Sequence, residues 1–115
     1  MKSAMQEIEY RGKTYKLVFD LNVMEAIQDE YGSIDAWGKL TEPEDGEPNV
    51  KALVFGVTEM INEGIDIDND ENGTDEKTLT HKQVARILTE VGLESVAEKM
   101  QKSVIDSTED DSKNA

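Results

Sequence analysis

The chain has 115 residues, with 26 Asp and Glu against 12 Lys and Arg, so its formal net charge is −14. An excess of acid argues against binding to phosphate backbones, and nucleic acid is not an expected partner. The lack of cysteine excludes disulfides, thiol catalysis and thiolate metal sites, and no segment approaches the roughly 18 apolar residues of a membrane span.

These properties predict one soluble, intracellular domain over residues 6–106. Residues 1–5 are expected to be a flexible N-terminus, and no secretory signal is evident there. Residues 107–115 are polar and acidic, without apolar anchors, and are expected to be a disordered tail. The acids are unevenly spread, because twelve of them, with a single base, lie in residues 41–76. We interpret them mainly as a solvated face, with a docking surface for a basic partner as the alternative.

Residues 6–19 predict a short β-hairpin around a tight turn at Gly12–Lys13. Glycine at the first central position suits a type II′ turn, and a bulged three-residue turn is the alternative. One register satisfies both faces of the ribbon by pairing Tyr10 with Tyr15, Ile8 with Leu17 and Glu9 with Lys16. Because a two-stranded ribbon is marginal alone, it must pack against helices or a partner strand.

Two helices are predicted next. Asp20 or Asn22 caps the first, which Gly32 ends, and Ser33 caps a short second helix. The apolar positions that recur at helical spacing are Val23, Met24, Ile27 and Tyr31 in the first helix, and Ile34, Trp37 and Leu40 in the second. We expect Trp37 to be a core anchor. Residues 41–49, with two prolines, one glycine and four acids, predict an exposed loop.

The third predicted helix, residues 49–63, is the most apolar and should be central to the core. Its stripe consists of Val50, Leu53, Val54, Val57, Met60 and Ile61. Gly64 is expected to end it, with a second acidic loop continuing to about residue 79. A capping box from Thr80 to Gln83 begins the next helix, Gly92 ends that one, and a final helix extends to residue 106. The fold class is therefore α+β and mainly helical, with an N-terminal hairpin packed against four to five helices.

Residues 68–73 have the opening spacing of a calcium loop. Asp68, Asp70 and Asn72 stand at its first, third and fifth positions, and Gly73 stands at the sixth. Position twelve, however, is Leu79, where a bidentate glutamate should complete the coordination shell. We therefore predict no specific metal site, and keep these three residues as the ligands of an alternative calcium-responsive module. The default interpretation is an acidic loop with a turn at residues 72–73.

No catalytic apparatus is evident. His81 is the sole histidine and falls in the first turn of its helix, where no cysteine or second histidine can join it. No carboxylate pair for acid–base work can be selected from spacing. We predict a non-enzymatic protein that needs no cofactor and works by binding other proteins.

Several segments together carry a family resemblance: the strand-to-helix stretch at residues 15–21, the helix at 24–32, the short helix start at 33–34, a long helix, and a late helix pair at 80–91 and 93–105. This layout, over residues 6–106, resembles the tail assembly chaperones of long-tailed bacteriophages and their prophage relatives. It is a likeness of element order, without an invariant chemical signature.

The resemblance implies a chaperone that coats the tape-measure protein and helps to recruit tail-tube subunits. Such a protein acts in the bacterial cytoplasm and is absent from the mature virion. Many members are made in two lengths by ribosomal frameshifting, and this chain would be the short form. A client-binding chaperone needs an apolar groove or an exposed strand edge, and Met24, Met60 and Met100 would suit an adaptable groove, although such residues are usually core. The hairpin edge offers a route to a homo-oligomer. The alternative function is a calcium-responsive or acidic protein-binding module.

Overall fold

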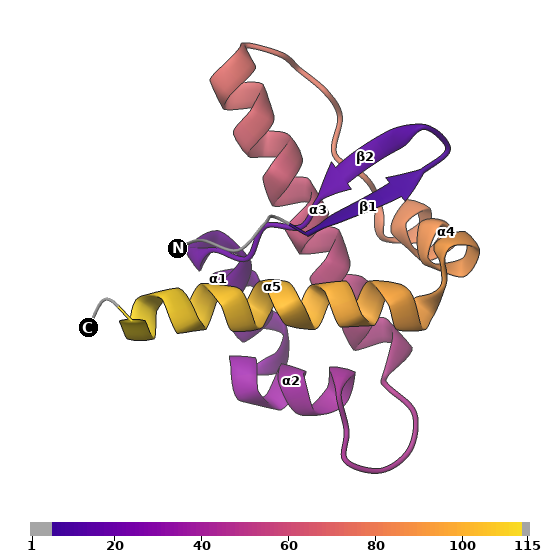
Figure 1. The fold of residues 1–115 in the computed structure, drawn as a ribbon, viewed down its shortest axis with the longest axis vertical. Coiled ribbons are helices and arrows are strands. Elements are labelled where there is room, and N and C mark those ends of the chain that lie inside the picture. Colours follow the sequence, from indigo (N-terminus) through magenta and orange to yellow (C-terminus); the bar gives the residue numbers. More distant parts are fainter. Residues whose placement is uncertain (1–5, 114–115) are drawn as a thin grey trace.

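The computed structural model describes residues 6–113 and consists of a two-stranded antiparallel sheet followed by five helices (Figure 1). The elements are β1 (Glu7–Tyr10), β2 (Lys13–Lys16), α1 (Leu21–Tyr31), α2 (Ile34–Thr41), α3 (Val50–Asn72), α4 (His81–Val91) and α5 (Leu93–Lys113). The predicted α+β, mainly helical fold with an N-terminal hairpin is confirmed. Within the described residues, none of the helices combines the length and the apolar character needed to cross a membrane. The predicted flexible segment at residues 1–5 lies outside them.

The hairpin forms where it was predicted, but its register is shifted by two residues. Tyr10 pairs with Lys13, so the turn is Arg11–Gly12 and the predicted turn at Gly12–Lys13 is wrong. Both turn residues have positive φ, 51° and 80°, as in a type I′ turn, whose twist matches that of the strands. Because side chains alternate along a strand, a slip of two residues keeps each on its face. Ile8 and Leu17 are accordingly both buried, although they are not paired.

Capping residues set the limits of the two short helices as predicted. The Asp20 side chain accepts a hydrogen bond from the Val23 amide at the start of α1, and Ser33 accepts one from the Ala36 amide at the start of α2. Gly32, with φ of 91°, follows the end of α1. These side chains satisfy amides that have no partner inside their helices, which is why each helix begins there.

Trp37 anchors α2 in the core, as predicted. Its side chain is buried, its indole N–H donates to the Ala52 carbonyl of α3 at 2.9 Å, and its ring stacks on Phe19. A Cβ at Gly56 would collide with this ring, so α2 and α3 approach closely because position 56 lacks a side chain. The expected burial of Leu40 is wrong, since the buried face of α2 continues to the next residue, Thr41, about 100° around the helix.

α3 is the central element, as predicted, and packs against α1, α2, α4 and β2. Its predicted end at Gly64 is wrong, because the helix continues to Asn72. Gly64 is buried against β2, and a Cβ there would lie 3.1 Å from the Lys16 carbonyl oxygen. This glycine therefore permits close packing of the hairpin. The helix ends at Gly73, whose φ of 66° lies in the left-handed region.

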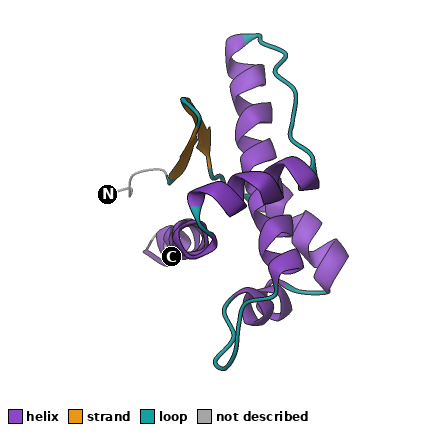
Figure 2. Ribbon diagram, turned by 90° about the vertical axis from the view of Figure 1, so that its right-hand side faces the viewer, coloured by secondary structure: helices purple, strands orange, loops and turns teal. Residues whose placement is uncertain are grey.

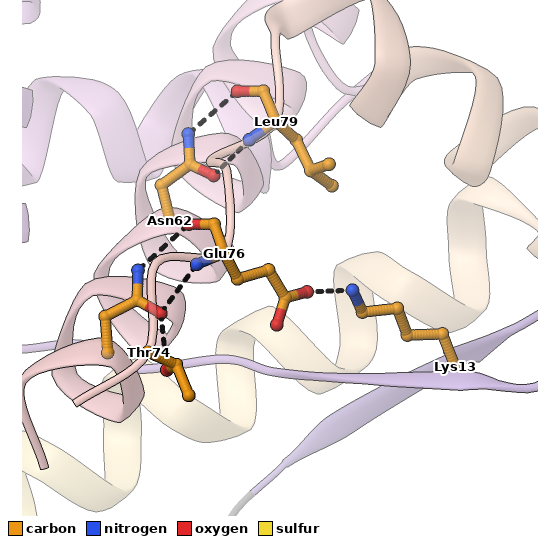
Figure 3. Close-up of polar contacts among 6 residues, drawn as sticks. Lys13, Asn62, Thr74, Glu76 and Leu79 are labelled. Atoms are coloured by element: carbon orange, nitrogen blue, oxygen red, sulfur yellow. Dashed lines mark hydrogen bonds and ion pairs between the residues drawn. The ribbon is translucent and has the colours of Figure 1, made fainter. Parts of the chain in front are cut away.

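The segment that joins α3 to α4, residues 74–80, runs back along the C-terminal half of α3 (Figure 2) and is called the strap below. Two asparagines of α3 hold its backbone in the same way (Figure 3). Asn62 donates to the Leu79 carbonyl at 2.9 Å and accepts from the Leu79 amide at 2.8 Å. Asn69 makes the same pair of bonds with Glu76, at 2.9 and 3.0 Å, and also accepts from the Thr74 hydroxyl.

The spacing of the two asparagines explains why both can bind the strap. Seven residues of helix rise about 10.5 Å, and three residues of extended chain span about 10 Å. Asn62 and Asn69 are seven apart on one face of α3, while Leu79 and Glu76 are three apart in the strap. The two spacings match, so an extended segment lies on the helix much as it would on a neighbouring strand.

Ion pairs connect the hairpin to the helical body. Lys13 pairs with Glu76 of the strap (Figure 3), Lys16 with Asp68 of α3 at 3.1 Å, and Arg11 with Glu90 of α4 at 3.0 Å. These side chains are about half exposed or more, so each pair orients the hairpin more than it stabilises the fold.

Both outer edges of the hairpin contact other parts of the chain. The Lys99 ammonium of α5 donates to the Glu7 carbonyl of β1 at 2.6 Å, and the Lys16 carbonyl of β2 faces Gly64. Addition of a strand at either edge would displace these contacts, which weakens the expectation that a ribbon edge recruits a second copy.

α4 begins at the predicted capping box, in which Thr80 and Gln83 exchange hydrogen bonds. Gly92 separates it from α5. The structure differs from the expected domain boundary at residue 106, because the helical backbone continues to Lys113. The Ser107 hydroxyl donates to the Phe19 carbonyl at 3.0 Å and fastens this part of α5 to the segment before α1.

Candidate functional site

The three residues of the alternative calcium site lie in the last turns of α3, so the predicted acidic loop is wrong at this point. Asp68 and Asp70 are two residues apart in a helix, which separates them by about 200° around its axis, so they lie on opposite sides of α3. Asp68 already pairs with Lys16. Among the side chains that the structure describes, no group of three or more His, Asp and Glu has the arrangement of a metal site. Residues 68–72 therefore do not have the backbone of a calcium loop.

The methionines considered for an adaptable groove belong to the core instead, which was the more usual role expected for them. Met60 and Met100 are fully buried in the core, and Met24 packs against that core. His81 is exposed at the start of α4, as predicted. Neither these methionines nor His81 line the two surface hollows described below.

A broad open groove of about 920 Å³ lies between α5 and the loop that joins α2 to α3. We call it the α5 groove. It is lined by Thr41, Glu42, Pro43, Gly46, Glu47, Pro48 and Val50 on the loop side and by Leu93, Glu94, Ser95, Ala97, Glu98, Gln101, Lys102 and Ile105 on the α5 side.

The α5 side of the groove is one face of a regular helix. Leu93, Ala97, Gln101 and Ile105 follow each other at intervals of four residues and form a single ridge. Ala97 contributes the smallest side chain of this ridge. Glu94, Glu98 and Lys102 form the adjacent row.

The loop side of the groove is held in place at its two ends. The Asn49 amide donates to the Leu40 carbonyl at 2.8 Å and closes the neck of the loop, and the Asn49 side chain caps α3. Gln101 donates to the Thr41 hydroxyl at 3.4 Å, which connects the loop to α5. The prolines at 43 and 48 further restrict the backbone. The groove is thus formed by a loop of limited freedom and a rigid helix.

Exposed apolar side chains line both walls of the groove. Val50, the first residue of α3, is 56 % exposed, and Ile105 of α5 is 49 % exposed. Two of the four large exposed apolar residues among residues 6–107 therefore line one hollow. Leu21, the most exposed at 79 %, lies elsewhere, at the start of α1. Apolar surface gathered in a groove is typical of a protein-binding site.

The rim of the α5 groove is acidic on both sides. Glu42 and Glu47 come from the loop, Glu94 and Glu98 come from α5, and all four are exposed. Lys102 is the one cation among the lining residues. The groove therefore offers an apolar floor between negative walls, the arrangement that suits an apolar segment flanked by positive charge.

A second hollow, of about 590 Å³, lies near the C-terminal half of α3 and is mainly polar. Its lining includes Asn22, Glu63, Asp66, Asp70 and Asp75. A hydrogen bond with Asp20, followed by desolvation, raises the pKa of Glu63. This second hollow has little apolar surface, and among the described residues no group of three or more acids there is arranged to hold a metal ion, so it is a weaker candidate than the α5 groove.

The sequence predicted the acidic surface but not the groove. The pattern assigned Val50 to the buried stripe of the third helix, whereas the structure exposes it at the helix start. Leu93 and Ala97 are only partly covered. Ile105 was not singled out. A usable signal was the row of Leu93, Ala97 and Ile105 at intervals of four, interrupted only by Gln101, next to a row that contains two glutamates.

Comparisons of the chain with protein-family models, with curated proteins and with solved structures give no significant match. The assignment of a function therefore depends on the groove, the surface charge and the order of the elements.

Proposed function

We propose that this chain is a tail assembly chaperone of a long-tailed phage or prophage, which binds the tape-measure protein and assists tail-tube assembly. The α5 groove is the observation that carries the proposal, because a chaperone for a helical client needs an accessible apolar surface on a soluble body. In this role the protein is not an enzyme, acts in the bacterial cytoplasm and is absent from the mature virion.

The order of the elements supports the same proposal. A hairpin leads into a capped helix, a short helix, a long central helix and a late pair of helices. This is the layout on which the resemblance to the chaperone family rests. The net charge of −14 supplies the solubility that a protein holding an aggregation-prone client requires.

A second candidate is an acidic protein-binding module that masks a basic surface of some other partner. The acidic rim of the α5 groove favours this candidate as much as it favours the chaperone. The calcium-responsive form of the alternative is not supported, because residues 68–72 are helical. The two remaining candidates differ in the client rather than in the surface used.

The test is co-expression with the tape-measure protein encoded beside this chain. We expect a tape-measure fragment that precipitates alone to stay soluble and to co-purify with the chain. An unrelated acidic protein of similar size and charge serves as the control for non-specific solubilisation. If a well-behaved fragment fails to co-purify, or if the unrelated protein retains it equally well, the chaperone proposal is wrong.

A further inference from the structure

We infer that the occupant of the α5 groove is an amphipathic helix whose apolar stripe is flanked by lysine or arginine. The inference rests on the proposed function in one respect, since it identifies the chemistry of the client segment that the chaperone holds. The groove, its charge and its dimensions carry the rest of the argument.

The dimensions of the groove fit a helix of about three turns. The lining residues of α5 extend from Leu93 to Ile105, a rise of about 18 Å. The ridge at intervals of four residues along α5 is the surface against which the ridges of a second helix pack. A docked helix would cover Val50 on the loop side and Ile105 on the α5 side, and the small side chain of Ala97 on α5 would allow a close approach.

The charge of the rim defines the polar flanks of the occupant. Four exposed glutamates against one lysine face any segment that enters the groove. Lysine or arginine beside the apolar stripe would meet Glu42 and Glu47 on one wall and Glu94 and Glu98 on the other. A segment with acidic flanks would be repelled by the same four groups.

The same charge argues against a second copy of the chain as the occupant. A protein of net charge −14 repels itself, and its one helix with a basic exposed face is already committed. α4 carries Lys82 and Arg86 on its exposed face, but its apolar residues Val84, Ile87 and Leu88 are buried in the core. It has no apolar stripe to offer the groove of another molecule, so the occupant is a different protein.

The test uses three synthetic peptides of about 18 residues and the full chain. One peptide has leucine at helical spacing with lysine on both flanks, a second replaces each lysine by glutamate, and a third scrambles the first to remove the stripe. Binding is measured by calorimetry at low and high salt. We expect saturable binding of the lysine peptide alone, and weakening as salt rises.

Two pairs of matched variants locate the binding. Val50→Ser with Ile105→Ser removes apolar contact from the groove, and Leu21→Ser removes an even more exposed apolar group at the start of α1. Glu94→Lys with Glu98→Lys reverses two rim charges, and Glu25→Lys with Asp29→Lys makes the same change at the same spacing on the exposed side of α1. We expect each groove double variant to lose about tenfold or more in affinity and each control to bind like the parent chain.

Each outcome decides the inference. Absence of binding by the lysine peptide, equal binding of the glutamate or scrambled peptide, or equal losses in groove and control variants would overturn it. Thermal unfolding of each variant verifies that it is folded. Changes in the assigned amide NMR shifts of the parent chain, when the peptide is added, locate the binding site without any variant. If the tape-measure fragment binds but the groove variants retain it, the inference fails and the proposed function stands. If the lysine peptide binds in the groove and the tape-measure fragment does not bind, the inference stands and the proposed function fails.

Discussion

Replacing Asn62 with Ala should release the strap from α3 and destabilise the whole domain. Asn62 makes two hydrogen bonds to the Leu79 backbone, and all of these groups are only partly accessible to water. Each bond contributes about 1 kcal/mol, and leaving partly buried backbone groups unpaired adds to the cost. Alanine recovers about 0.5 kcal/mol through its higher helix propensity. The free energy of unfolding should therefore fall by about 2 kcal/mol, which corresponds to a loss of about 8 °C in Tm.

Asn69→Ala is the matched comparison, because it removes the equivalent pair of bonds to Glu76 at a more exposed position. Water replaces those bonds more readily, so we expect a loss of about 1 kcal/mol or less. Urea unfolding followed by circular dichroism gives both values. Hydrogen exchange of the Leu79 amide should accelerate in the Asn62 variant and remain slow in the Asn69 variant. Equal losses in the two variants, or an unchanged Leu79 amide, would refute the view that Asn62 is the principal clamp of the strap.

Three further predictions concern the core, a helix cap and the pH dependence of stability. Gly56→Ala should destabilise the domain by about 1–3 kcal/mol despite the better helix propensity of alanine, because its Cβ collides with Trp37, and the fluorescence of that sole tryptophan should change. Thr80→Ala should cost about 1 kcal/mol in urea unfolding by removing the cap of α4, and an unchanged midpoint would contradict the capping box. The hydrogen bond with Asp20 raises the pKa of Glu63 above its ordinary value of 4.5. Just above pH 4.5 the folded state therefore binds more protons than the unfolded state. This group thus makes the free energy of unfolding rise as the pH falls from neutrality toward 4.5. Glu63→Gln should remove that contribution and raise the free energy of unfolding at neutral pH. An unchanged dependence of stability on pH in the variant would contradict this role of Glu63.

Local chemistry determined the helix starts, and these were predictable. Asp20, Ser33 and Thr80 each accept a hydrogen bond from an amide three residues later, and the sequence around each shows this directly. Asn49 does the same for α3. A cap depends on a few neighbouring residues, so no tertiary information is needed to recognise it.

The errors arose where distant residues decide the outcome. Gly64 resembles a helix end in sequence, but it is a contact point for the Lys16 carbonyl, which lies 48 positions earlier in the chain. The acidic residues after it stay helical because Asn69 and the strap cover one side of α3. The hairpin register follows from a turn at Arg11–Gly12, and both registers considered keep Ile8 and Leu17 on the buried face, so the hydrophobic pattern cannot distinguish them.

The α5 groove was not predictable for a related reason. A groove forms between segments, and its loop wall and its helical wall are more than forty residues apart in the chain. Of its exposed apolar residues, Val50 looks in sequence like a member of a buried stripe, and Ile105 does not stand out. The acidic character of the region was visible in residues 41–76, because charge is a property of composition. Sequence alone therefore indicated a binding protein but not where it binds.

The most direct test of the account is the retention of a tape-measure fragment by three forms of the chain at equal concentration: the parent, the Val50→Ser/Ile105→Ser variant and the Leu21→Ser variant. We expect the parent and Leu21→Ser to retain the fragment in soluble form and the groove variant to release most of it. Equal retention by all three would show that the client does not use the α5 groove, and no retention by the parent would contradict the proposed function itself.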